Sequence, residues 1–224
     1  MEVKLITYYT ESYKRIFNEL FIKRIPPSFE PIVVDYVPDI NSVPGFVMSD
    51  TFKTLSFRRV ELIYNHIKSN MGNVVIFCDV DIVFFKDFKE DVLERIKDYD
   101  ILFQDNTNGT YNCGFMVFMC SEKTLKFWEM IMNSYNENKN EYINEQFAVN
   151  ELIHTTDIKH GFLPETYHAN PHWCNPNNSG DVYRTINSIP QNAFLSHCIA
   201  IENGEENKHK IMSEIIEKFK NNIE

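Results

Sequence analysis

The sequence predicts an α/β fold built on a parallel sheet, and three observations support this class. First, the run VVIFC at residues 74–78 is apolar throughout, which is typical of a strand buried on both faces. Second, short β-branched segments alternate along the chain with segments of helical periodicity. Third, 43% of the 224 residues are hydrophobic, including 18 Phe and 11 Tyr, which is ample for a large core.

The N-terminal half is predicted to be a succession of β-α units. Pro26 and Pro27 end the first helix, because proline cannot continue the helical hydrogen-bond pattern. A loop punctuated by proline and glycine leads from the second strand to the second helix. The expected strands are residues 3–8, 31–37 and 74–78, the expected helices are residues 12–24 and 51–69, and the loop is residues 38–45.

The C-terminal half is predicted to be less regular. Ser121 is a good N-cap for a helix whose apolar residues Leu125, Trp128, Ile131 and Met132 share one face. The stretch 164–179 is rich in Asn, Pro and His without periodicity and is predicted to be a long functional loop. Strands are expected at 100–103 and 114–120, and helices at 89–97, 143–153 and from about 207 onward. We expect a single domain, residues 1–224.

Composition excludes several classes of protein. A net charge of −10 argues against nucleic acid as a partner, since such binding depends on clustered Lys and Arg. No apolar run is long enough to span a membrane, and the start MEVKLITYYTES lacks the features of a signal peptide, so we expect a soluble, cytoplasmic protein. The five cysteines contain no C-x-x-C pair, which argues against a disulfide framework or a zinc ribbon.

Two aspartates, Asp79 and Asp81, interrupt the apolar run NVVIFCDVDIVFFKD. Carboxylates are rarely buried without a partner, so the pair is expected where the strand emerges at its carboxyl end, the place where ligands bind in parallel sheets. In extended backbone the two side chains point to one face about 6.6 Å apart, at roughly 3.3 Å rise per residue. That arrangement suits one hard divalent cation bound through oxygen.

Several segments in order then resemble one family. The acidic pair looks like the D-x-D motif of glycosyltransferases with the Rossmann-like GT-A fold. More closely, the chain resembles the nucleotide-diphospho-sugar transferase family, in the segments TLSFRRVELIYNHI, FCDVDIVFFKDF, DNTNGTYNCGFMVFMCSEKTLKFW, NEQFAVNEL and FLSHCIAIENGEENKHK. The resemblance runs from about residue 3 to 210. It implies a mixed, mostly parallel central sheet flanked by helices, with a nucleotide-binding half (1–105) and an acceptor-side half (106–224).

The resemblance also implies a metal site. In similar enzymes the second Asp of D-x-D binds Mn²⁺ or Mg²⁺, the first contacts the metal or the donor ribose, and the residue between them presents its backbone to the ribose. These roles fall on Asp81, Asp79 and Val80. His197 resembles the late His that completes the metal site, although a lone His in an apolar stretch is more often a core residue. A mixed Asp and His ligand set favours Mn²⁺.

Further donor contacts are carried over from the family. A tyrosine after the first strand offers a stacking surface for uracil, a glycine allows the backbone to approach the sugar closely, and a lysine after the late His meets the diphosphate. Lys210 is the alternative to the lysine chosen, and Arg58 is the alternative to the arginine, since only one of the two can point inward. The donor-binding candidates are Thr7, Tyr8, Tyr9, Arg59, Asp79, Val80, Asp105, Asn112, Gly114 and Lys208.

The catalytic candidates are Glu145 and Gln146. Similar enzymes often have D-D-Q or D-Q beside the anomeric carbon, whereas this chain has Asn144, Glu145 and Gln146. Glu145 can serve as the base for the acceptor hydroxyl, or Gln146 can support an oxocarbenium-like centre. On the acceptor side, His172 and Trp173 suggest a pocket in which the indole stacks on a sugar ring.

The sequence therefore predicts a metal-dependent hexosyl- or pentosyltransferase that moves a sugar from a nucleotide diphosphate, most simply a UDP-sugar, to a hydroxyl of a glycan acceptor. The alternative is a non-catalytic sugar-nucleotide or glycan-binding module on the same fold. A nucleotidyltransferase is disfavoured because TYYTES contains no glycine to cradle a triphosphate, and a two-metal phosphohydrolase needs more clustered His and Asp. The oligomeric state is not predicted.

Overall fold

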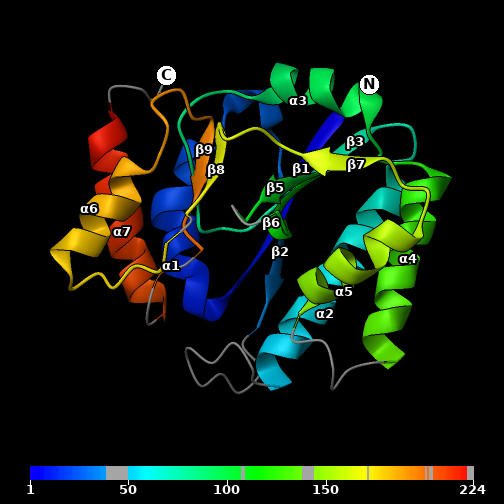
Figure 1. Cartoon of the computed structure of the whole chain (residues 1–224), viewed down its shortest axis with the longest axis horizontal. Coiled ribbons are helices and arrows are strands. Elements are labelled where there is room, and N and C mark those ends of the chain that lie inside the picture. Colours follow the sequence, from blue (N-terminus) through cyan, green and yellow to red (C-terminus); the bar gives the residue numbers. More distant parts are fainter. Residues whose placement is uncertain are drawn as a thin grey trace.

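A computed structural model shows a six-stranded central sheet with helices on both faces (Figure 1). It describes residues 1–38, 50–106, 109–137, 144–170, 172–199, 201 and 204–220. The strand order is β2-β1-β3-β6-β5-β7, and neighbours are parallel except where β6 pairs with β3 and β5. The strands are β1 (Val3–Thr10), β2 (Val33–Val37), β3 (Val74–Cys78), β5 (Ile101–Asp105), β6 (Tyr111–Met119) and β7 (His160–Phe162).

One face of the sheet is covered by α2 (Asp50–Ser69), α4 (Glu122–Glu137) and α5 (Glu145–Leu152) (Figure 1). The fully buried Trp128 of α4 anchors this layer: it packs edge-on against Phe118 of β6, and its indole N–H donates to the Val60 carbonyl of α2 at 3.0 Å. The core on this face therefore joins two helices and the sheet through one large side chain.

The opposite face carries a helical segment after β1 and a second, three-stranded sheet of order β4-β9-β8. Phe17 and Phe21 of the helical segment pack in the same cluster as Phe84, Phe115 and Tyr167. The short strands are β4 (Ile82–Phe84), β8 (Tyr167–Ala169) and β9 (Leu195–His197). This small sheet brings a segment near residue 197 beside the strand that follows Cys78, which is what builds the site described below.

The remaining helical elements surround these layers (Figure 1). The segment after β1 is irregular, with short 3₁₀, α and π stretches: Glu11–Tyr13, α1 (Lys14–Ile16), Phe17–Phe21 and Ile22–Arg24. The others are α3 (Lys89–Arg95), α6 (Ser179–Asn187) and α7 (Gly204–Phe219), with 3₁₀ turns Pro27–Phe29, Ile96–Asp98 and Ile153–Thr155. Among the helices of the described residues, none combines the length and the apolar character needed to cross a membrane.

The structure confirms the predicted mixed α/β class and most of the predicted elements. Ser121 caps α4 as expected: its hydroxyl accepts from the Thr124 N–H at 3.2 Å, and the Thr124 hydroxyl accepts from the Ser121 N–H at 2.8 Å. Most of the predicted loop 38–45, and Ile143 at the predicted start of the next helix, lie outside the described residues. The division into nucleotide-binding and acceptor-side halves stays a prediction.

The prediction of a loop over 164–179 holds for most of its described residues, but β8 lies within this stretch and α6 begins at its end. Three further short strands, β4, β7 and β9, were not anticipated. Each of the four strands is three residues long. Such a segment is too short for an alternating pattern to appear, so its pairing with distant residues decides its conformation.

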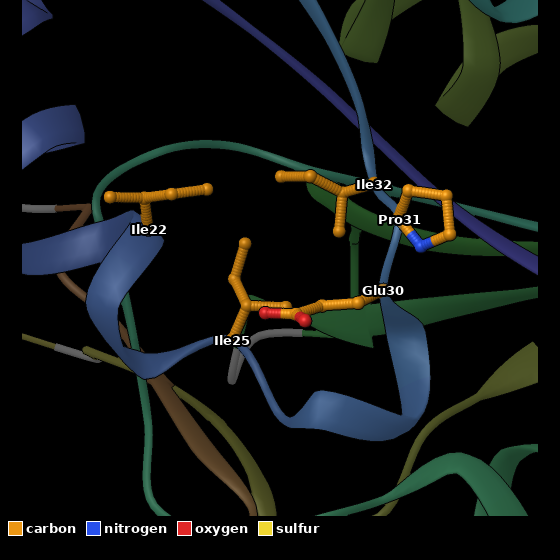
Figure 2. A pocket seen from close by; sticks show the side chains of 5 residues that line it. All are labelled: Ile22, Ile25, Glu30, Pro31 and Ile32. Atoms are coloured by element: carbon orange, nitrogen blue, oxygen red, sulfur yellow. The ribbon is translucent and has the colours of Figure 1, made fainter.

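A surface pocket of about 490 Å³ lies in the segment that leads from the irregular helix to β2 (Figure 2). Its walls are mainly apolar, and the one carboxylate, that of Glu30, extends toward Ile25. The lining residues are Ile22, Ile25, Glu30, Pro31 and Ile32, none of which is a candidate from the sequence. The pocket therefore shares no lining residue with the site described below.

The two tryptophans of the chain give a matched test of this core. Trp128→Ala removes a fully buried indole and should lower the free energy of unfolding by about 3–5 kcal/mol. Trp173→Ala, at a position 64% exposed, should change it by no more than about 0.5 kcal/mol. Urea unfolding followed by circular dichroism measures both variants, and equal effects would contradict the described packing.

Candidate metal and donor site

The site forms where β3 and β6 meet the small sheet. The Asp79 N–H donates to the Gly114 carbonyl at 2.7 Å, which extends the β3–β6 pairing by one residue beyond Cys78. On the other side, β4 and β9 pair so that Ile82 lies opposite His197. Backbone pairing thus brings Asp79 and Asp81 close to His197, although more than half the length of the chain separates them in the sequence.

Asp79, Asp81 and His197 converge in the space between these strands. One ligand atom from each lies within 4.8 Å of the others. His197 Nε2 is 3.3 Å from Asp81 Oδ1 and 3.8 Å from Asp79 Oδ2. Asp81 and His197 are buried and Asp79 is half-buried. Two carboxylates and an imidazole directed at one point fit a divalent cation such as Mn²⁺ or Mg²⁺.

Lys208 of α7 compensates the charge of Asp81. Its ammonium donates to Asp81 Oδ2 and lies 5.6 Å from the Tyr13 ring centroid. Burial alone would raise the pKa of Asp81, but Lys208 and His197 outweigh burial and hold that pKa well below its usual range. Burial would also lower the pKa of Lys208, yet the Asp81 carboxylate raises it. Asp81 is therefore ionised and Lys208 protonated at neutral pH.

Arg59 of α2 bridges the other aspartate to α5. Its guanidinium Nη1 lies 2.9 Å from Glu145 Oε1 and 3.5 Å from Asp79 Oδ2. Burial raises the pKa of Glu145, and Arg59 opposes this; burial likewise raises the pKa of Asp79, against the same guanidinium. Arg58 instead lies on the surface and pairs with Glu61 at 2.7 Å, so Arg59 is the arginine that points inward.

Gly114 provides the room that the metal-ligating side chains occupy. A Cβ atom at this position would lie 2.1 Å from His197 Cε1 and 2.7 Å from Asp79 Oδ2. The sequence predicted that this glycine admits the donor sugar. In the structure two of the proposed metal ligands pack directly on its Cα, which is a sufficient reason for glycine here.

The three residues proposed for the nucleotide base are divided between both faces of β1. Tyr8 lies on the α2 side, with its ring centroid 6.0 Å from Arg59 Cζ. Burial raises the pKa of Tyr8 to about 12. Tyr9 stacks on Phe17 of the opposite layer at 4.3 Å between ring centroids. Thr7 is fully buried, and its hydroxyl donates to the Cys78 carbonyl at 2.7 Å, which fastens β1 to β3.

Most other sequence candidates line the same end of the sheet. Asn112 accepts from the Gly114 N–H and donates to Asn106, both at 2.8 Å, and Asp105 ends β5 directly opposite Tyr111. The Val80 side chain is buried in the core, which leaves only its backbone for the ribose contact predicted from the sequence. Gln146 accepts from the Cys113 N–H at 3.1 Å and so attaches α5 to β6.

The acceptor-side candidates follow β8. Ala169 at the end of β8 pairs with His197, and the Asn170 N–H donates to the His197 carbonyl at 3.0 Å. His172 is half-buried, and Trp173 beyond it is largely exposed. This segment is therefore attached to the strand that carries a proposed metal ligand. Lys210 lies apart from the acidic pair and donates to the Pro176 carbonyl at 3.0 Å.

Sequence reasoning missed Gln104, a fully buried polar residue of β5. Its Oε1 lies 2.8 Å from His197 Nδ1. The only sequence signal was a single amide at the end of the apolar run ILFQ, and such residues are common at strand ends.

Comparison with solved structures defines the class of fold. The chain is similar to a glycosyltransferase involved in the glycosylation of the major capsid of PBCV-1, with a TM-score of 0.63 and 15% identity over 94% of this chain and 98% of that one. It is also similar to the glycosyltransferase GlyE of Streptococcus pneumoniae TIGR4 (TM-score 0.55, 13% identity, 98% of this chain and 64% of that one). The galactosyltransferase LgtC gives a TM-score of 0.52 at 10% identity, over 98% and 99% of the two chains. These similarities show the GT-A fold.

The sequence identifies the family. The family model for nucleotide-diphospho-sugar transferases matches residues 27–212, and the chain belongs to this family. Among curated protein sequences, none matches it significantly. The fold and family expected from the sequence are both confirmed.

Replacement of Gly114 tests the packing of the site. Gly114→Ala should weaken Mn²⁺ binding by at least about tenfold, because the added methyl displaces His197 and Asp79. Gly180→Ala in α6 is the matched control, since its Cβ would come no closer than 3.3 Å to the Asn178 side chain. Calorimetric titration with Mn²⁺ compares the two, and an unchanged affinity in Gly114→Ala would contradict the described geometry.

Proposed function

We propose that this protein is a metal-dependent glycosyltransferase that transfers a hexose or pentose from a nucleotide diphosphate sugar, most simply a UDP-sugar, to a hydroxyl of a glycan. The observation that carries the proposal is the convergence of Asp79, Asp81 and His197 at the end of β3 in a member of this family. A bound Mn²⁺ or Mg²⁺ would be held by these three residues and would supply Lewis-acid stabilisation of the departing diphosphate.

The cations of the chain then act on the donor phosphates and sugar. Lys208 is protonated beside Asp81 and is available to a diphosphate that reaches the acidic pair. Arg59 is held by Glu145 and Asp79 at the other side of the site. A chain with a net charge of −10 thus presents two positive groups at the one place where a dianionic leaving group must be stabilised.

For the chemical step we propose Glu145 and Gln146. The Glu145 side chain is buried and its Oε1 pairs with Arg59, which favours a role through that arginine over direct removal of the acceptor proton. Gln146, the second residue of the same helix, directs its side chain at the β6 backbone, beside Asn112 and Gly114. These neighbours support placing the sugar near the N-terminus of α5, next to the start of β6.

For the acceptor we propose the segment containing His172 and Trp173. An exposed indole provides an apolar surface for the C–H face of a sugar ring, and this segment follows the strand that pairs with β9. The acceptor would then approach from the β8 side while the donor lies over β3 and β6.

Removing one carboxylate tests the metal site. Asp81→Asn should lower Mn²⁺-dependent affinity for UDP by more than about 100-fold, because loss even of an outer-shell partner typically costs about 10- to 100-fold. Asp87→Asn, an exposed aspartate in the same stretch, is the matched control. Equilibrium binding of UDP with and without Mn²⁺ measures the effect. Retention of the Mn²⁺-dependent affinity would overturn the assignment.

Activity is tested separately with Mn²⁺ and a panel of nucleotide sugars. We expect slow hydrolysis of one donor in the absence of acceptor, detected as released nucleoside diphosphate. Donor binding without hydrolysis or transfer would instead support a sugar-nucleotide-binding module.

A double-mutant cycle tests the role of Glu145. If it acts through Arg59, then Glu145→Gln and Arg59→Gln should be strongly non-additive in kcat/KM, with a coupling of about 0.5–3 kcal/mol. If Glu145 were instead an independent general base, Glu145→Gln would lower kcat by about 100- to 10,000-fold, both in the wild-type background and in Arg59→Gln. Additive effects would therefore exclude the role through Arg59.

A further inference from the structure

Gln104 joins the central sheet to the small sheet through three hydrogen bonds. Its amide nitrogen donates to the carbonyls of Tyr167 at 3.0 Å and His168 at 2.9 Å, both in β8. Its amide oxygen lies 2.8 Å from Nδ1 of His197 in β9. The side chain is fully buried, so water cannot replace any of these partners.

These contacts fix the orientation of the amide. Backbone carbonyls only accept hydrogen bonds, so the NH₂ group of Gln104 must face Tyr167 and His168. The flipped amide would press its oxygen against two carbonyl oxygens, with no donor between them in a fully buried place. The oxygen therefore faces His197, and since it can only accept, the imidazole must donate from Nδ1.

We propose that Gln104 is a positioning residue that fixes His197 as the Nδ1–H tautomer and so directs the lone pair of Nε2 toward a divalent cation between Asp79 and Asp81. The proposal rests on the metal site of the proposed function. It assigns to Gln104 the orienting role that a partner of a metal-ligating histidine performs.

The second histidine of the small sheet shows why the partner matters. His168 of β8 has Ser196 Oγ 3.0 Å from Nδ1 and Ser188 Oγ 3.2 Å from Nε2. The Ser188 hydroxyl donates its one proton to the Thr185 carbonyl at 2.8 Å, so it accepts from Nε2 of His168, and the Ser196 hydroxyl donates to Nδ1. The partners of the two histidines thus favour opposite protonation: Nε2–H at His168, and Nδ1–H at His197, where Gln104 Oε1 can only accept.

The tautomer is measured directly in the metal-free protein. Two-bond ¹⁵N–¹H correlation spectra at about pH 8, where ordinary imidazoles are neutral, distinguish a protonated from an unprotonated ring nitrogen. We expect the His197 signals to show a protonated Nδ1 whether or not Nε2 also carries a proton, because Nε2 faces the Asp81 carboxylate at 3.3 Å when no cation is bound. An unprotonated Nδ1, in all or part of the signal, would overturn the proposal without any variant.

Three variants then separate positioning from structural support. Gln104→Met keeps the length but removes the acceptor, and Mn²⁺ affinity should fall roughly 10- to 100-fold. Gln104→Glu keeps an acceptor oxygen toward His197 but loses the amide donor to β8, so it should recover most of that affinity while remaining less stable than wild type. Ser196→Ala removes the hydrogen bond to His168 in the same small sheet and should leave the affinity unchanged.

Calorimetric Mn²⁺ titration and urea unfolding give affinity and stability for each variant. If the Mn²⁺ affinity of the variants simply follows their free energy of unfolding, and Gln104→Glu binds Mn²⁺ no more tightly than Gln104→Met, then Gln104 only joins the two sheets. That result would overturn the proposal. If Gln104→Met does not fold, the wild-type tautomer and Gln104→Glu still decide. Failure of the wild-type chain to bind Mn²⁺ would contradict the proposed function instead, whatever the tautomer.

Discussion

Two carboxylates held beside a buried imidazole are the constraint on which the rest of this structure depends. Asp79 and Asp81 repel each other and lose hydration at the end of β3, so the fold must supply compensation. It does so from separate elements: Arg59 of α2 lies beside Asp79, and Lys208 of α7 lies beside Asp81. Together with His197 of β9, these side chains tie three distant parts of the chain to one short strand end.

The small sheet is what makes this arrangement possible. Without β4 and β9 paired in their observed register, His197 would not lie opposite Ile82 and next to Asp81. Gln104 of β5 then links the central sheet to β8 and β9 of the small sheet. The two sheets of the GT-A fold are thus joined at the proposed metal site. The close packing of His197 on Gly114 leaves little room for either residue to move.

The sequence predicted the fold class, the long helices and the acidic pair because each depends on local information. VVIFC is apolar throughout, α4 has an apolar face and a serine cap, and an aspartate pair stands out in such a context. The short strands were missed because pairing between distant residues decides their conformation. Gln104 was missed because its significance lies in the residues across from it, and Glu145 could not be recognised as an ion-pair partner of Arg59 without the packing of α5 on α2.

The central claim is that Asp79, Asp81 and His197 bind one divalent cation. Crystals grown with Mn²⁺ and UDP, measured at the manganese absorption edge, test it most directly. The account predicts a single anomalous peak at the end of β3, coordinated by oxygens of both aspartates and by Nε2 of His197. A manganese ion bound elsewhere, or bound here through the aspartates with His197 turned away, would contradict it.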